Sequence, residues 1–191
     1  MLNDTRVFEA NSQGGGAFGD LPEWDLSDLY ASEDAAELQA DLTWLKQSCI
    51  DFSNDYEGKL AQLNADEMLK AVERYEAIDI IAGRIMSFAG LRYYQLTTDP
   101  ERAKFMSDMQ DKLTEHTTKL VFYGLEFNRL DEEALSKLLS QNTALARYKP
   151  VFDRMRAMKP YQLSDEMERF LHDQSVVGAA AWNRLFDETV A

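Results

Sequence analysis

Cysteine, histidine and long apolar stretches are scarce in this sequence, and each scarcity excludes a class of protein. Its 191 residues contain one cysteine, Cys49, which excludes an internal disulfide framework and any metal site built from several cysteines. Because Ile50 and Phe52 lie beside it, we expect a half-buried structural thiol in a reducing compartment rather than a reactive nucleophile. No apolar run approaches the ~20 residues that a membrane-spanning helix needs.

Basic residues are also few, with 20 lysines and arginines against 34 aspartates and glutamates, which gives a net charge of −14. Nucleic acids and anionic lipids are bound largely through lysine and arginine, so we expect neither nucleic acid nor a membrane as a partner. Residues 1–10 carry Asp4, Arg6 and Glu9 and lack the apolar stretch of a secretion signal. We therefore predict a cytoplasmic protein.

The composition divides the chain into a short tail and a helical domain. Residues 1–20 include three consecutive glycines, Gly14 to Gly16, and little that a core would bury, which predicts a flexible N-terminal tail. This interpretation is favoured over a phosphate-binding loop because no helix follows the glycines directly. Residues 21–191 show helical periodicity almost throughout and no convincing pair of strands. The predicted class is all-α.

Capping residues and apolar periodicity predict the first two helices. Ser32 is expected to cap a helix whose apolar residues recur near every 3.6 positions, at Leu38, Leu42, Leu45, Cys49 and Phe52. Asn64 and Glu67 have the spacing of a capping box. A long helix over roughly 65–95 follows, with an apolar stripe made of Met68, Val72, Tyr75, Ile78, Ile81, Ile85, Phe88 and Leu91.

A second long helix is predicted over roughly 99–127. It follows a break at Thr97–Glu101, where Pro100 suits the first helical turn. Its apolar residues are Phe105, Met106, Met109, Leu113, Leu120 and Leu125. The two long helices, each about 40–45 Å at 1.5 Å per residue, are expected to lie antiparallel at the centre of a multi-helix bundle.

Shorter helices are predicted to complete the bundle. The acidic residues Asp131 to Glu133 are expected to open one, Pro150 lies near the start of the next, which Pro160 ends, and Ser164 is expected to cap a third. A last amphipathic helix is predicted from about Ser175 to the end of the chain. Its apolar side contains Val177, Ala181, Trp182, Leu185 and Phe186.

The sequence contains no recognisable catalytic centre. Glu115 and His116 are adjacent, so on a helix their side chains point about 100° apart and cannot hold one metal ion. Glu168 and His172 have a spacing that would place them near one ion, but a surface contact is the favoured interpretation. No His-Glu-x-x-His segment and no serine or cysteine nucleophile motif is present.

One short segment departs from the acidic balance of the chain. Residues 147–159 contain five basic residues and a single acidic one, Asp153. Such a patch could hold an anionic ligand or an acidic partner. We favour a solvated helix face that balances an acidic neighbour.

Three segments together resemble the oligoendopeptidase F family, the helical zinc metallopeptidases of the thimet-oligopeptidase class. They are Leu21–Tyr30 (LPEWDLSDLY), Lys159–Ser164 (KPYQLS) with Glu166 and Glu168, and Ala181–Glu188 (AWNRLFDE). In the first segment, Trp24, Leu26 and Leu29 would supply an apolar anchor for a hydrophobic groove. The order and spacing of the three segments match, so the resemblance covers most of residues 21–191.

The resemblance implies a longer helical peptidase with a deep channel that admits only short peptides. Zinc, held by a His-Glu-x-x-His helix and a further glutamate in the C-terminal part, would activate water for hydrolysis. The region that matches here is the N-terminal helical portion, which helps to wall and cap the channel. Because this sequence contains none of the zinc residues, no catalytic, metal-binding or cofactor-binding residue is carried over, and substrate-binding residues are unknown.

We therefore expect a non-catalytic N-terminal domain whose partner is the C-terminal catalytic domain of the same protein. The apolar face of the final helix has no polar ending, so we expect a fragment with exposed apolar surface that allows self-association. The alternative is a stand-alone helical interaction module without enzymatic activity. It would bind a protein through its apolar faces or through residues 147–159.

Overall fold

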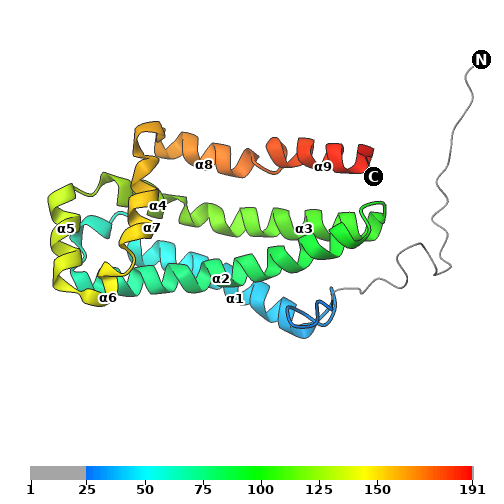
Figure 1. Cartoon of the computed structure of the whole chain (residues 1–191), viewed down its shortest axis with the longest axis horizontal. Coiled ribbons are helices and arrows are strands. Elements are labelled where there is room, and N and C mark those ends of the chain that lie inside the picture. The colour runs from blue at the N-terminus through cyan, green and yellow to red at the C-terminus, as the bar shows by residue number, and fades with distance from the viewer. Residues whose placement is uncertain (1–24, 191) are drawn as a thin grey trace, which may run out of the picture.

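A computed structural model describes residues 25–190, and within this range the predicted all-α class is confirmed (Figure 1). Neither a strand nor a cis peptide bond occurs in the described range. The predicted tail, residues 1–20, and the predicted anchor residue Trp24 lie outside it. The α-helices are α1 (Ala36–Tyr56), α2 (Ala65–Gln95), α3 (Pro100–Thr117), α4 (Val121–Arg129), α5 (Glu132–Gln141), α6 (Thr143–Ala146), α7 (Lys149–Ala157), α8 (Asp165–Gln174) and α9 (Ala179–Val190).

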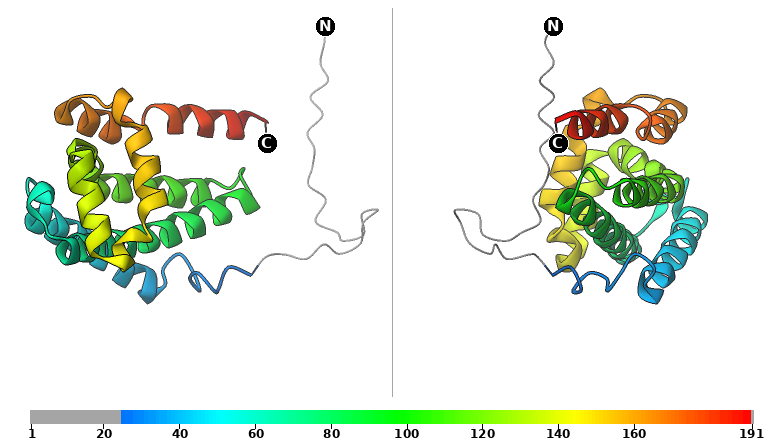
Figure 2. Two further views of the ribbon diagram at one scale, coloured as in Figure 1. Left: turned by 60° about the vertical axis from the view of Figure 1, so that its left-hand side comes forward. Right: turned by 90° about the vertical axis from the view of Figure 1, so that its right-hand side faces the viewer.

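The two long central helices lie antiparallel, as predicted, and α1 packs against both (Figures 1 and 2). The predicted capping box of α2 is present, because Asn64 accepts the amide of Glu67 at 3.0 Å and Glu67 accepts the amide of Asn64 at 2.9 Å. At the start of α3, the Asp99 carboxylate accepts the amide of Glu101 at 2.9 Å, and Pro100 occupies the first turn.

The second long helix is not continuous, which corrects the prediction of one helix over 99–127. A 3-10 turn at Thr118–Leu120 separates α3 from α4. The hydroxyls of Thr117 and Thr118 donate to the carbonyls of Leu113 and Thr114, at 2.8 and 2.7 Å. Threonines that bond to the preceding turn compete with the amide ladder and bend helices, which accounts for the interruption at this point.

The predicted cap of α1 at Ser32 is wrong. The Ser32 hydroxyl donates to the Asp34 carboxylate at 2.6 Å, and α1 begins four residues later, after Ala35, without a side-chain cap. The predicted apolar face of α1 is nevertheless confirmed, since its five residues are all buried. Cys49 is fully buried rather than half-buried.

Arg84 on α2 fastens the segment that precedes α1. Its guanidinium donates to the carbonyl oxygen of Leu29 and, at 3.2 Å, to the carboxylate of Asp41, and it lies 4.2 Å from the centre of the Tyr30 ring. The Tyr30 hydroxyl donates to the same Asp41 carboxylate at 2.7 Å. Burial, together with Asp41, raises the pKa of Tyr30. Residues 25–35 are thereby tied to both α1 and α2.

Aromatic side chains fill the centre of the bundle. The Phe52 ring contacts the rings of Tyr56, Tyr75, Phe122 and Tyr123, with centroids 4.9–5.9 Å apart. Such offset and edge-to-face pairs add to the free energy of burial.

One member of the predicted apolar stripe on α2 is not in this core. Leu91 is exposed, because the buried face of the helix passes from Phe88 to Ala89 and Tyr93 in the last turns of α2.

The helices α5 and α6 pack against α2, and α7 packs against α4 (Figure 2). Asn142 donates to the Asp66 carboxylate at 2.7 Å, and the Tyr148 hydroxyl donates to Glu76 at 2.7 Å. The starts of α5, α7 and α8 agree with the predictions from Asp131, Pro150 and Ser164.

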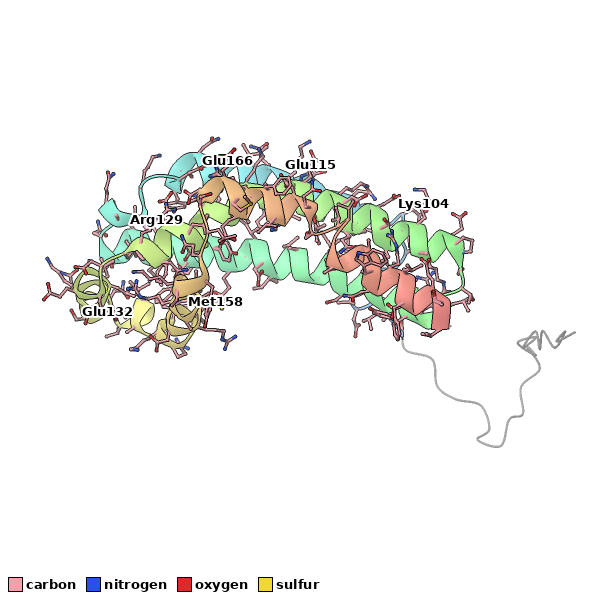
Figure 3. All side chains as sticks on the ribbon, turned by 90° about the horizontal axis from the view of Figure 1, so that it is seen from above. Lys104, Glu115, Arg129, Glu132, Met158 and Glu166 are labelled. Atoms are coloured by element: carbon pink, nitrogen blue, oxygen red, sulfur yellow. The ribbon has the colours of Figure 1, made fainter. Side chains whose placement is uncertain are left out.

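The chain then turns back, and α8 and α9 run along the α3–α4 side of the bundle (Figures 1 and 3). The last helix begins at Ala179, not at Ser175, because the chain turns at Ser175–Gly178. The Gly178 amide donates to the carbonyl of Gln174 at 2.9 Å, and a Cβ at this glycine would lie only 3.1 Å from that oxygen. No described helix is long and apolar enough to cross a lipid bilayer.

Candidate functional site: an exposed apolar surface

The helix α8 turns its polar side toward the bundle. Four residues on one side of α8 contact side chains at the end of α1, in α3, in α4 and in the turn between α3 and α4. The pairs are Asp165 with Arg129, Arg169 with Glu57, His172 with Thr117 and Asp173 with Thr118. The ring Nε2 of His172 lies 3.1 Å from the Thr117 hydroxyl. These contacts fix which side of α8 faces outward.

The apolar side of α8 faces water. Met167, Phe170 and Leu171 follow the i, i+3, i+4 spacing of one helix face, and they are 46–55% exposed. An amphipathic helix on a globular protein normally buries that face against the core. The reversed orientation of α8 therefore leaves a packing face without a described partner.

The helix α9 has the same character. Trp182, Leu185, Phe186 and Val190 also share one face and are 52–71% exposed. The Arg184 guanidinium donates to the hydroxyl of Ser107 on α3 at 3.0 Å, and neither α8 nor α9 contains a buried residue. The predicted amphipathic helix is confirmed, and its apolar side lies in solvent.

We call these seven residues of α8 and α9 the α8–α9 surface. The connection that leads into α8 and the turn between the two helices add further exposed apolar side chains, Met158, Tyr161, Leu163 and Val177. Figure 3 shows both helices on one side of the bundle. Concentrations of exposed apolar side chains of this kind mark surfaces that meet another protein.

Glu168 and His172 have different hydrogen-bond partners in the structure. Glu168 accepts the amide of Leu163 at 2.8 Å and closes the turn before α8, whereas His172 contacts Thr117. Burial lowers the pKa of His116, while its neighbour Glu115 is exposed. Within residues 25–190, no group of three histidine, cysteine, aspartate or glutamate side chains could hold a metal ion.

The basic patch at 147–159 is partly balanced by acidic neighbours, as the favoured interpretation expects. Lys149 pairs with Asp153 at 2.7 Å, and Arg156 pairs with Glu132 at 2.9 Å. Arg156 also donates to the carbonyl of Leu130 at 3.0 Å, so it fastens α7 to the α4–α5 connection.

Cys49 lies on α1 and is buried in the core of the bundle. Burial raises the pKa of the Cys49 thiol to about 11, outweighing the opposing effect of the Lys119 charge. A thiol with so high a pKa is a poor nucleophile at neutral pH. The prediction of a structural thiol is therefore confirmed.

The first motif of the resemblance is anchored as predicted in its described part. Leu26 and Leu29 are half-buried against the core, and Tyr30, which the sequence interpretation did not single out, is buried. The contact between Tyr30 and the partly buried Arg84 is difficult to predict, because Arg84 comes from 54 positions further along the chain.

Comparisons with known proteins agree on one family. The family model described as Oligopeptidase F matches residues 126–191. A plasmid-encoded oligoendopeptidase F of Lactococcus lactis subsp. cremoris is 24% identical over 155 residues, which is 80% of this chain and 25% of that protein. The oligopeptidase PepF of Bacillus subtilis is 25% identical over 166 residues, 84% of this chain and 23% of that protein.

An oligoendopeptidase F homolog of Lactococcus lactis subsp. lactis is 24% identical over 148 residues, 78% of this chain and 24% of its own length. The chain thus spans about a quarter of the length of these curated relatives. No solved structure matches it significantly.

Proposed function

Since this chain resembles the N-terminal region of the oligoendopeptidase F family, we propose that it is the non-catalytic N-terminal part of a zinc-dependent oligoendopeptidase that hydrolyses short peptides. The whole protein would be cytoplasmic, and this part would shape and cap its substrate channel. The observation that supports the proposal is the α8–α9 surface, whose apolar residues face away from the bundle.

In this proposal the α8–α9 surface packs against the catalytic part of the same protein. Burying a large apolar side chain contributes about 1.5–3 kcal/mol, so seven such residues provide a substantial driving force for docking. The polar contacts of α8 hold it in the orientation that docking needs. The family-model match covers α8 and α9 fully, and it leaves out the long central helices α2 and α3.

The zinc of such an enzyme does not fit the residues of this chain. The described residues contain no cluster of three potential ligands. We therefore assign no step of peptide hydrolysis to any residue here. The 191-residue chain alone is expected to hydrolyse no peptide with or without added zinc, and chelator-sensitive cleavage by pure protein would overturn this expectation.

The gene offers the first test. We expect the reading frame to continue after the codon for Ala191 for several hundred residues and to encode a His-Glu-x-x-His segment. A stop codon at that position would contradict the proposal. The stand-alone interaction module would then become the working function, because the same exposed surface would serve to bind a separate protein.

The docking step is tested by mixing this chain with the separately expressed polypeptide encoded downstream. The expected result is a one-to-one complex in analytical ultracentrifugation. The double variant W182S/F186S should weaken the complex at least about 100-fold, since apolar residues at the centre of an interface contribute about 2 kcal/mol or more each. Ile80 on α2 is a matched control, because it is 62% exposed but lies outside the α8–α9 surface.

The control variant I80S should bind as well as the unchanged chain. Equal binding by W182S/F186S and by I80S would refute the docking role of the α8–α9 surface. Self-association of the unchanged chain alone, abolished by W182S/F186S, would show that a second copy covers the surface in place of the catalytic part.

A further inference from the structure

A cavity of about 1390 Å³ opens at the end of the bundle where α2 turns into α3. Its walls come from the segment 25–34, from the last turns of α2 and from the first turn of α3. The cavity is larger than the usual 300–1,000 Å³ of a small-molecule site, so it has room for an extended segment of several residues.

The cavity has an apolar floor. Tyr30 and Phe88 are buried there in an edge-to-face contact, with ring centroids 5.4 Å apart. Leu91, Tyr94 and Leu96 line the wall formed by α2 and remain exposed. An occupant would therefore gain free energy by covering these apolar side chains.

The charged groups around this floor are mostly acidic. Among the described residues, five carboxylates and two guanidiniums line the cavity. Arg92 already pairs with Glu33 at 3.3 Å, and Arg102 pairs with Asp99 at 3.5 Å. Among residues 25–190, three lining carboxylates form no close ion pair, namely Asp25, Asp34 and Glu101. Lys104, which pairs with Asp108, interacts with Glu101 only at longer range.

Hydrogen bonds further favour the ionised form of two of these carboxylates. The Ser27 amide donates to Asp25 at 2.9 Å, and these contacts with Ser27 lower the pKa of Asp25. The Ser32 hydroxyl likewise lowers the pKa of Asp34. The two sides of the cavity thus combine fixed negative charge with exposed apolar surface.

We propose that this cavity binds a short, free peptide that carries lysine or arginine side chains next to apolar ones. The basic side chains would pair with Asp25, Asp34 and Glu101, and the apolar ones would cover Leu91, Tyr94 and Leu96. A metal ion does not match the site, because the described residues contain no group of three potential ligands close enough to share one. The proposal concerns this chain alone, so it stands or falls separately from docking to a catalytic part.

The binding test uses an isotope-labelled sample of the full 191-residue chain and three capped hexapeptides. The first alternates lysine with leucine and phenylalanine, the second replaces each lysine by glutamate, and the third replaces each apolar residue by serine. Amide resonances of residues 25–34 and 88–102 should shift and saturate with the first peptide. The other two should bind at least about tenfold more weakly, and the affinity of the first should fall as salt rises from about 0.05 to about 0.5 M.

Charge-removing variants then test whether the peptide contacts these three carboxylates. D25N/D34N/E101Q keeps the shape of each side chain and removes the three charges, and it should weaken binding of the first peptide roughly tenfold, because the basic side chains lose their exposed ion-pair partners. The control D111N/E115Q/E73Q removes three exposed charges elsewhere and should bind like the unchanged chain. The proposal would be overturned if both variants weakened peptide binding equally. It would also be overturned if the resonance shifts were scattered over the acidic surface, or if the glutamate peptide bound equally well.

Discussion

Two parts of this molecule use the same amphipathic pattern in opposite ways. In α1 to α4 the apolar face of each helix points inward, and Leu38, Phe52, Met68 and Phe127 are completely buried. In α8 and α9 the same spacing occurs, but the apolar residues face solvent and the polar ones contact the bundle. Helical periodicity therefore identifies a packing face without showing whether this chain or another polypeptide covers it.

The largest expected difference between the two parts is in stability. Phe52→Ala should lower the free energy of unfolding by about 3–5 kcal/mol, because it leaves a cavity among four aromatic rings. Phe186→Ala should change it by less than about 0.5 kcal/mol, since this side chain is exposed. Urea denaturation followed by circular dichroism measures both. Similar losses for the two variants would show that α9 is part of the cooperative core.

The polar contacts of Arg84 are expected to contribute more to stability than those of α8. Arg84→Met should cost about 2 kcal/mol, because the carbonyl of Leu29 and the carboxylate of Asp41 lose a charged donor and Tyr30 loses its cation. Hydrogen exchange should accelerate in residues 26–35 more than in α8. If Arg84→Lys restored full stability, the planar, multiply bonded geometry would not be the source of the effect.

The capping box of α2 is expected to contribute less. Asn64→Ala should lower the free energy of unfolding by about 1 kcal/mol, as for other side-chain caps. Ser164→Ala, which removes the cap of α8, should be nearly silent in global unfolding, because α8 buries no residue. Thermal unfolding scans compare the two variants, and an equal loss for Ser164→Ala would contradict the division into two parts.

The titration of Cys49 should make the stability of the buried core depend on pH. Its pKa rises from 9.0 to about 11 on burial, so the folded chain holds the thiol proton more tightly than the unfolded chain does. This contribution to stability is full below pH 9 and is lost as pH rises from about 9 to 11. Urea midpoints should fall over this range, and Cys49→Ala should flatten the first part of the fall. The buried tyrosines Tyr30 and Tyr123, whose pKa values are also raised, act at higher pH.

The smallest effect is expected for the ion pairs that hold α8. Arg169→Ala removes the pair with Glu57, whose two side chains are both partly exposed, and should cost about 0.5 kcal/mol. Amide exchange in α8 should nevertheless accelerate, because this pair ties the helix to α1. Unchanged exchange in α8 would show that the remaining contacts with Arg129, Thr117 and Thr118 suffice.

Local patterns predicted most of the bundle. The capping box at Asn64, the break at Pro100 and the buried face of α1 depend on residues close together in the sequence, and the structure contains all three. Predictions failed where a competing local bond decided the outcome. The Ser32 hydroxyl donates to Asp34 and does not cap α1. The hydroxyls of Thr117 and Thr118 donate to the preceding turn, where the second long helix is interrupted.

Only part of the candidate site could be predicted from the sequence. The apolar residues of α9 were identified from their spacing, but the outward orientation of α8 depends on partners 36 to 112 positions away, such as Arg129 and Glu57. The cavity at the α2–α3 turn likewise joins residues 25–34 to residues 88–102. Such contacts are set by tertiary packing, and a single sequence carries no local signal for them.

Hydrogen exchange across α8 and α9 tests the central claim most directly. It compares this 191-residue chain with the longer protein that the proposal expects the complete reading frame to encode. The account predicts rapid exchange in α9 for the chain alone, strong protection in the longer protein, and unchanged exchange in α1 and α2. Equally rapid exchange of α9 in both proteins would contradict the claim that the α8–α9 surface docks on the catalytic part.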